Sequence, residues 1–293
     1  RVRGSYALEV MFTDYPGEIF VARKDSPMII GIAGGETYVA SDVPAILKYT
    51  RNVYYIGNLQ LARLRPGQAI FYDLNGDEIE IEPTEITFSA EAAEKEDRID
   101  LSEVGLTDEE IQNISQIYIV ACGSAWHVGM AAQYIFEDLA ELPVRVELAS
   151  EFRYRRMPLD SNALVVIISQ SGETADSLAA LREAKTKGLK TMGIVNVVGS
   201  SIAREADRVF YTLAGPEIAV ATTKAYSAQL IACDILAVQF GKVRGKLTEE
   251  QYGELIAKLR LLPEKMSRLL EEKERIQWFA AKFASAKDVF FVG

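Results

Sequence analysis

Hydrophobic and polar positions change their spacing partway along this chain. Up to about residue 90, the apolar residues form short runs separated by Pro, Gly and Asp, which is typical of β-strands. From Gln116 onward, longer apolar runs alternate with stretches whose apolar residues recur at helical spacing. Strands that alternate with helices predict an α/β fold with a doubly wound parallel sheet, which binds ligands at the carboxyl ends of its strands.

The first region is predicted to be β-rich, and a polar segment follows it. An Asn75-Gly76 turn predicts a hairpin. Thr107 and Glu110 have capping-box spacing, which predicts a short helix. We expect strands at 6–12, 18–23, 28–32, 37–40, 69–72 and 78–81, a helix at 43–49, and a linker at 91–112.

The second region is predicted to hold five strands, and a helical segment follows it. Thr248 and Gln251 repeat the capping-box spacing, and Pro263 indicates the start of a further helix. The final run, 287–293, is similar to 116–123 and predicts the first strand of a second, truncated α/β domain. We expect strands at 117–121, 144–148, 163–168, 191–196 and 209–213, helices at 127–139, 175–187 and 222–240 with a short one after 199–201, and linking helices at 246–286.

Charge and composition exclude several functional classes. The net charge is −10, which argues against a nucleic-acid partner or an anionic membrane surface. No apolar run approaches membrane-spanning length. The chain has two cysteines in apolar surroundings and one histidine, which indicates a cytoplasmic protein with no metal site.

The most informative stretch is the hydroxyl-rich segment 169–174, Ser-Gln-Ser-Gly-Glu-Thr. It follows the apolar run 163–168 and opens the helical pattern of 175–187. The first turn of a helix has unpaired N–H groups and a partial positive charge, which suit a phosphate. Hydroxyl groups add donors, and Gly172 allows close approach of the backbone, so we predict a phosphate site here.

Four other reactive side chains have alternative interpretations. His127 has the chemistry of a general acid or base, but we favour a polar residue in the first turn of a helix. Cys122 follows a predicted buried strand and is interpreted as a core residue rather than a nucleophile. Lys224 is interpreted as a structural residue or as a source of positive field for an anion, rather than as a lysine that pairs with a phosphate or forms a Schiff base. Glu173 is expected to interact with the helix N-terminus or an interface partner rather than act as a base.

Several motifs together resemble one family. They are Ala121-Cys122-Gly123, the stretch 147–155, the segment 169–176, Gly199-Ser200-Ser201, the stretch 214–225, and, in the β-rich region, 3–6 and 40–42. In this order they resemble glutamine–fructose-6-phosphate aminotransferase (isomerizing), also called glucosamine-6-phosphate synthase. The segment 169–174 alone resembles the sugar-phosphate isomerase (SIS) domains, two of which form the isomerase part of that family.

The resemblance implies a domain organisation and an activity. It implies the C-terminal part of an N-terminal-nucleophile glutaminase domain at 1–90, a first SIS domain at 113–245, a helical linker at 246–286, and the first strand of a second SIS domain at 287–293. The family makes glucosamine 6-phosphate from fructose 6-phosphate and glutamine without a cofactor. Either sugar phosphate is the implied ligand, and a homodimer is the implied assembly.

The resemblance also carries site residues over to this chain. Ala125 stands where the family usually has a serine, so one substrate hydroxyl contact is in question. The catalytic groups of the family fall in regions outside this sequence, so no catalytic residue is expected in this chain, which should bind sugar phosphate without turnover. The implied sugar-phosphate ligands are Ser124, Ser169, Gln170, Ser171, Gly172, Thr174, Val220 and Thr222.

Two other functional classes remain as alternatives. A non-catalytic SIS module that senses sugar phosphates would use the same loop without the catalytic half. A nucleotide-binding doubly wound domain would instead bind ATP or NAD.

Overall fold

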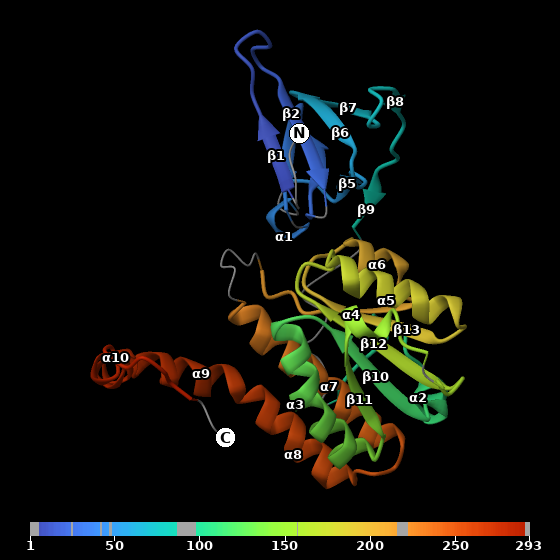
Figure 1. Ribbon diagram of the computed structural model, residues 1–293, viewed down its shortest axis with the longest axis vertical. Helices are drawn as coiled ribbons and strands as arrows, with labels where there is room; N and C mark the ends of the chain where they lie inside the picture. The colour runs from blue at the N-terminus through green and yellow to red at the C-terminus, as the bar shows by residue number, and fades with distance from the viewer. Residues whose placement is uncertain are drawn as a thin grey trace. The chain divides into compact units, whose positions relative to one another are not determined.

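The computed structural model describes residues 6–24, 26–41, 43–46, 49–86, 98–156, 158–215 and 222–290. The chain divides into two compact units, Arg1–Leu247 and Thr248–Gly293, and each is described by itself. The first unit contains a β-rich part followed by an α/β part. The predicted α/β class is therefore confirmed (Figure 1).

The β-rich part contains two antiparallel sheets, with strand orders β1-β2-β6-β7-β8 and β4-β3-β5-β9. Val21 and Leu64 from one sheet pack with Ile30 from the other, so the core of this part lies between the sheets. The elements are β1 (Tyr6–Val10), β2 (Ile19–Lys24), β3 (Ile29–Ala33), β4 (Glu36–Ala40), α1 (Val43–Ile46), β5 (Asn52–Tyr55), β6 (Leu61–Arg65), β7 (Gln68–Tyr72), β8 (Glu78–Ile79) and β9 (Thr84–Glu85).

The predicted hairpin around Asn75 is confirmed, since β7 pairs antiparallel with β8. Gly76 has φ +87°, and the Asp73 carboxylate accepts hydrogen bonds from the N–H groups of Asn75 and Asp77. A glycine in this left-handed conformation closes the turn without steric cost.

The α/β part has a five-stranded sheet in which every pairing is parallel. Its strand order is β11-β10-β12-β13-β14. The elements are α2 (Asp108–Asn113), β10 (Gln116–Ala121), α3 (Ser124–Ala140), β11 (Val144–Leu148), α4 (Ala149–Phe152), β12 (Ala163–Ser169), α5 (Ala175–Thr186), β13 (Lys190–Val195), α6 (Ser201–Glu205), β14 (Arg208–Tyr211) and α7 (Lys224–Val243).

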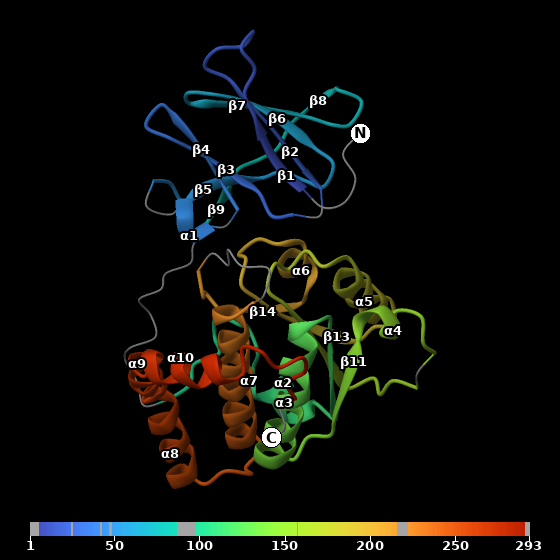
Figure 2. The same cartoon turned by 60° about the vertical axis from the view of Figure 1, so that its left-hand side comes forward.

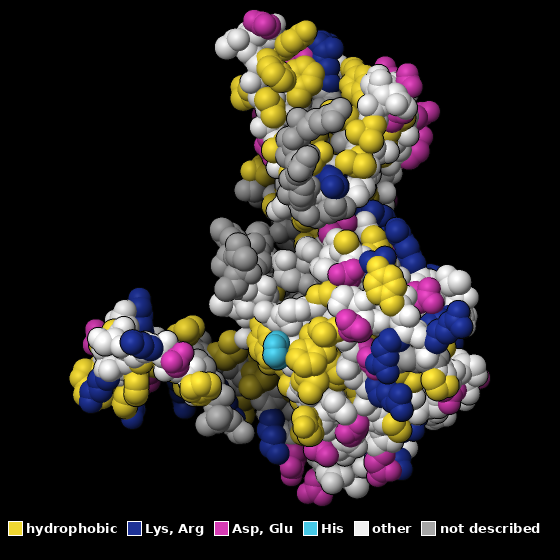
Figure 3. Space-filling model, viewed as in Figure 1, with side chains coloured by type: hydrophobic (Ala, Val, Ile, Leu, Met, Phe, Trp, Pro, Cys, Tyr) yellow, Lys and Arg dark blue, Asp and Glu magenta, His cyan; other side chains and the backbone are white. Residues whose placement is uncertain are grey.

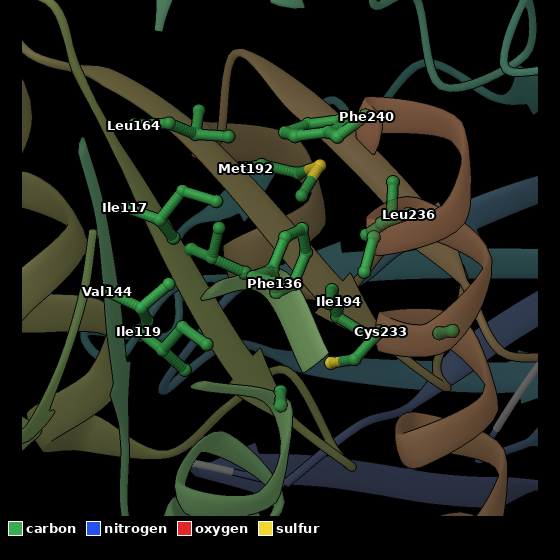
Figure 4. Close-up of a cluster of buried hydrophobic side chains, with 14 of the residues drawn as sticks. Ile117, Ile119, Phe136, Val144, Leu164, Met192, Ile194, Cys233, Leu236 and Phe240 are labelled. Carbon is green, nitrogen blue, oxygen red and sulfur yellow. The ribbon is translucent and has the colours of Figure 1, made fainter. Parts of the chain in front are cut away.

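Helices cover both faces of this sheet. On one face, α3 and α7 lie side by side, as both Figure 1 and Figure 2 show. Figure 4 shows Phe136 of α3 and Phe240 of α7 facing the strand residues Ile117 and Leu164, and the two rings are 5.6 Å apart in an edge-to-face arrangement. On the other face, α4, α5 and α6 contribute Phe152, Leu181 and Ile202 to a second cluster of buried side chains. With 49% of its residues apolar, the chain has enough hydrophobic side chains to fill both clusters.

The strand order determines where a ligand site is expected. If the five strands are numbered along the chain, their order in the sheet is 2-1-3-4-5. From β10 the chain first adds a strand on one side (β11) and then adds the remaining strands on the other side, so the direction of winding reverses between β10 and β12. Ligands of doubly wound sheets bind outside the carboxyl ends of the strands at this reversal. The segments after Ala121 and Ser169 leave the sheet at that position, because Ala121 pairs with Ile168.

Both predicted capping boxes are confirmed. Thr107 Oγ1 accepts from the Glu110 N–H at 3.2 Å, and the Thr107 N–H donates to the Glu110 carboxylate. Thr248 and Gln251 make the equivalent pair at the start of α8. In the predicted linker, residues 91–97 lie outside the described residues, whereas Leu101 packs into the core of the α/β part.

The second unit is helical in its described residues. Its elements are α8 (Glu249–Arg260), α9 (Leu262–Glu271) and α10 (Lys273–Lys282). Pro263 lies in the first turn of α9, as its sequence position predicts. For the predicted final strand, residues 287–290 are in no strand, and residues 291–293 lie outside the described residues.

Candidate functional site

The hydroxyl-rich loop directly follows the central strand of the parallel sheet. Ser169 is the last residue of β12 and is buried, with 3% of its surface exposed. Its Oγ accepts the Gly172 N–H at 3.1 Å and lies 3.1 Å from Thr174 Oγ1. The Glu173 N–H donates to Ser171 Oγ at 3.2 Å. The structure therefore brings the predicted hydroxyl groups of this loop together in one tight turn.

The loop is hydrogen-bonded to the residue that follows the neighbouring strand β13 and to helix α6. The Asn196 N–H donates to the Gln170 carbonyl at 3.1 Å, and the Ile202 N–H donates to the Gly172 carbonyl at 3.0 Å. The buried Asn196 side chain also donates to the Gly215 carbonyl and accepts from the Ala214 N–H. The contacts made by the Asn196 and Ile202 N–H groups use backbone carbonyls of the loop, so they do not occupy its serine hydroxyls.

Helix α5 begins where the loop ends. Thr174 is its N-cap residue, and the Thr174 side chain makes no capping hydrogen bond to the first turn. The Asp176 carboxylate in that turn is paired with Arg153 at 2.8 Å. A twelve-residue helix with an uncapped first turn presents N–H groups and the positive end of its dipole. An anionic ligand is favoured at this position.

Ser124 lies on the adjacent strand end. It is the first residue of α3, follows Gly123 with φ +56°, and is exposed. Because β10 and β12 are hydrogen-bonded neighbours, the loop carrying Ser124 and the loop beginning at Ser169 leave the same edge of the sheet side by side. Ala125, next in α3, presents no hydroxyl there.

Thr222 lies at the start of α7, at the same end of the α/β part. At the C-terminal ends of α3 and α7, the Arg244 side chain donates to the Ala140 carbonyl at 3.1 Å. Because α3 and α7 pack side by side with their C-termini together and have similar lengths, their N-termini share one edge. Thr222 is half-buried, and Val220 lies outside the described residues.

A residue that sequence reasoning missed is Arg23. Arg23 Nη2 of β2 lies 3.0 Å from the Glu173 carboxylate, and both side chains are buried. Glu173 was expected to interact with the helix N-terminus or with an interface partner, and the structure pairs it with Arg23 of the same chain. The signal for Arg23 is its position two residues after Val21, because alternate residues of a strand share a face and Val21 is in the core.

The alternative reactive residues have unremarkable surroundings. His127 is exposed in the first turns of α3, and its ring lies edge-on to Trp126. The Ser177 hydroxyl donates to Cys122 Sγ at 3.8 Å. Lys224 is an exposed first residue of α7. Their roles stay predictions.

No metal-binding group of three or more His, Cys, Asp or Glu residues occurs within the described ranges. None of the helices in those ranges combines the length and apolar character that a bilayer crossing needs. On the face shown in Figure 3, basic and acidic side chains are interspersed over the α/β part.

A cavity of about 180 Å³ lies at the opposite edge of the sheet, among the first residues of its strands. Its lining includes Glu110, Lys190 and Arg208. Lys190 and Arg208 both pair with the Glu110 carboxylate, at 3.2 and 3.0 Å. Asp207 also lines the cavity, so two carboxylates balance the two cations and the cavity is a weaker anion site than the loop after β12.

A known protein family matches the part of the chain that contains the candidate site. Residues 110–239, which contain most of the parallel sheet and the hydroxyl-rich loop, match the SIS domain family. The α/β part is therefore similar to SIS domains over these residues.

Over its full length, the chain is similar to curated glutamine–fructose-6-phosphate aminotransferases (isomerizing). It is 44% identical over 321 positions to that of Caldanaerobacter subterraneus subsp. tengcongensis and 43% identical to that of Clostridium acetobutylicum. The alignments cover 100% of this chain and 53% of each relative, so the chain spans about half the length of the curated relatives it matches. The chain is thus a relative of these aminotransferases.

Among solved structures, the C-terminal domain of glucosamine-fructose-6-phosphate aminotransferase from Francisella tularensis is similar, with a TM-score of 0.59 and 38% identity. The match covers 61% of this chain and 50% of that chain.

Proposed function

We propose that the loop 169–174 binds the phosphate group of fructose 6-phosphate or glucosamine 6-phosphate. The observation that carries the proposal is the position of Ser169. Its buried hydroxyl lies at the carboxyl end of the central strand, where the winding of the sheet reverses and α5 begins. Anionic ligands are favoured at such a position by geometry and by the helix dipole.

Each part of the loop has a distinct role in this proposal. Ser169, Ser171 and Thr174 donate hydroxyl hydrogen bonds to phosphate oxygens, and Gln170 adds its side-chain amide. Gly172 allows the phosphate to approach the backbone. Hydrogen bonds to a charged group contribute about 1.5–3 kcal/mol each, so three or four of them supply micromolar to millimolar affinity after the costs of binding.

The sugar is proposed to extend from the loop toward α3 and α7. In this proposal, Ser124 at the start of α3 and Thr222 just before α7 contact sugar hydroxyls, with Val220 as a further contact. Ala125 provides no hydroxyl, so the sugar is held on this side by fewer hydrogen bonds than a serine there would give.

The relatives support a proposal for the role of the whole protein. We propose that the chain is part of an enzyme that makes glucosamine 6-phosphate from fructose 6-phosphate and glutamine. The β-rich part would be the C-terminal part of its glutaminase domain, and the SIS domain at about 113–245 its sugar-phosphate-binding half. A helical linker at 246–286 would lead to a second SIS domain, in a cytoplasmic homodimer.

In this proposal, the residues of the loop bind and position substrate, and none of them is catalytic. The binding energy of the phosphate holds C1 and C2 of the open-chain sugar in place for proton transfer. Acid–base groups would come from the second SIS domain.

A calorimetric ligand panel tests this function. We expect fructose 6-phosphate and glucosamine 6-phosphate to bind, and fructose to bind at least about a hundredfold more weakly, because it lacks the anion. ATP and NAD should not bind. Binding of the nucleotides, or no binding of either sugar phosphate, would contradict the proposal.

A turnover assay separates the enzyme from a sensor. The full-length protein should form glucosamine 6-phosphate from fructose 6-phosphate and glutamine. Binding without turnover in that protein would favour the non-catalytic sensing module instead.

A further inference from the structure

The hydroxyl-rich loop carries one negative charge of its own. Glu173 lies between Ser171 and Thr174, and its side chain is 5% exposed. A ligand phosphate at this loop is also negative. Two negative groups so close in a buried setting repel each other unless a cation compensates one of them.

A cation from the β-rich part provides that compensation. Arg23 Nη2 donates to Glu173 Oε2 at 3.0 Å, although the two residues are 150 positions apart. The Arg23 side chain is only 3% exposed, and its Nη1 donates to the Ile56 carbonyl at 3.2 Å. The guanidinium is therefore held in place from its own part of the fold.

The remaining contacts of Glu173 keep its carboxylate directed toward α6. Glu173 Oε1 accepts the Ser201 N–H at 2.9 Å, and Oε2 accepts the Ser201 hydroxyl at 2.8 Å. Arg204 Nη2 donates to that same hydroxyl at 3.1 Å, so a second cation lies one contact further away. Glu173 is thus the meeting point of the loop, α6 and β2.

A second contact brings the same two parts together beside the loop. A Cβ atom at Gly199 would lie 2.1 Å from the Tyr55 ring, so the ring rests directly on this glycine. Tyr55, Val198 and Tyr211 belong to one apolar cluster. The β-rich part therefore packs directly against the segment that precedes α6.

We propose that Arg23 is a positioning residue of the sugar-phosphate site. Its charge neutralises Glu173 and holds the carboxylate against Ser201, so that the loop presents hydroxyl and N–H donors to the phosphate without a competing anion. The proposal rests on the proposed function, because it concerns the affinity of the same loop. It assigns the β-rich part a direct share in sugar-phosphate binding.

The test measures fructose 6-phosphate affinity of the full chain by calorimetry, with thermal unfolding of the unliganded protein alongside. Arg23→Met, which removes the charge, should weaken binding at least about tenfold. Arg23→Lys, which keeps the charge, should bind within about threefold of the wild type. The double variant R23M/E173Q, which removes both charges, should recover most of the lost affinity.

The single variant E173Q distinguishes charge compensation from a merely structural role. If the ion pair only stabilised the fold, E173Q would weaken binding as R23M does, because it breaks the same pair; charge compensation predicts that E173Q binds at least as tightly as the wild type. Arg63→Met is the matched control, since Arg63 pairs with Glu18 in the same part of the chain. It should lower the melting temperature and leave the affinity unchanged.

The outcomes separate the two proposals. If the wild type binds and R23M binds equally well, or the double variant shows no recovery, the role of Arg23 is overturned and the proposed function stands. If the wild type and R63M both fail to bind, the proposed function fails and this role fails with it. If R23M does not fold, E173Q decides: affinity equal to or tighter than wild type supports charge compensation, and a tenfold loss overturns it.

Discussion

Ser200 occupies the space that a side chain at Gly172 would need. A Cβ atom at Gly172 would lie 2.0 Å from Ser200 Oγ and 2.5 Å from its Cβ. Gly172 also has φ +64°, and Ser200 is buried. The loop after β12 and the start of α6 are thus in such close contact that only glycine fits between them.

Gly172→Ala should therefore destabilise the protein by about 2–5 kcal/mol, from the left-handed backbone and from the clash together. Gly188→Ala is the matched control. Gly188 has a similar φ of +75°, but nothing lies within 4 Å of the added carbon, so only about 1–2 kcal/mol should be lost. Urea unfolding followed by circular dichroism measures both. Equal losses in the two variants would show that Ser200 yields without cost.

Glu18 should make stability depend on pH in the acid range. Hydrogen bonds from Arg63, and further ones from Arg65, lower the pKa of the Glu18 carboxyl from 4.5 to about 2. The ionised carboxylate thus favours the folded state above about pH 4.5, and this contribution is lost as the pH falls toward 2.

The stability difference between the wild type and Glu18→Gln reports this contribution. We expect the difference in urea unfolding free energy to be constant from pH 7 to 5 and to shrink steadily between pH 4.5 and 2. A difference that does not change down to pH 3 would exclude the ion pair as its source.

The two cysteines should differ in reactivity. Cys233 lies in the core of the α/β part, and burial raises the pKa of its thiol. Cys122 is only partly buried. Because the thiolate is the reactive form, a thiol reagent should modify Cys233 only when the protein unfolds. In a Cys122→Ala variant, labelling of the native protein by such a reagent would contradict this arrangement.

The parallel sheet was predictable because its strands are buried on both faces. The run that became β12, Ala163–Ser169, is uninterrupted in apolar character up to its last residue, and a helical pattern follows it. Both capping boxes were readable for a similar reason, since they depend on residues three positions apart. Such patterns depend only on residues that are close in sequence, so they can be recognised without knowing the tertiary contacts.

Other elements depend on distant partners and were missed. Strands β5, β6 and β9 are held by pairing with strands far along the chain, and β9 has only two residues. The four-residue helix α4 is positioned by Phe152, which is fully buried in the cluster beneath it. Short segments carry little periodicity, so tertiary contacts decide their structure.

The candidate site was predicted in part. The hydroxyl-rich loop could be recognised from its sequence, and the structure brings its residues together. The pairing of Arg23 with Glu173 could not, because it joins two parts separated by 150 positions. The proposed roles of Arg23, Ser124 and Thr222 are all tested by measuring ligand binding.

The most direct test of the account is the fructose 6-phosphate affinity of the double variant Ser169→Ala, Ser171→Ala. Each hydroxyl lost from a charged ligand costs about 1.5–3 kcal/mol, so the pair should weaken binding by at least about a hundredfold. Thr186→Ala, which removes a hydroxyl at the far end of α5, is the control and should bind as the wild type does. Calorimetry that shows unchanged affinity in the double variant would contradict the assignment of residues 169–174 as the phosphate site.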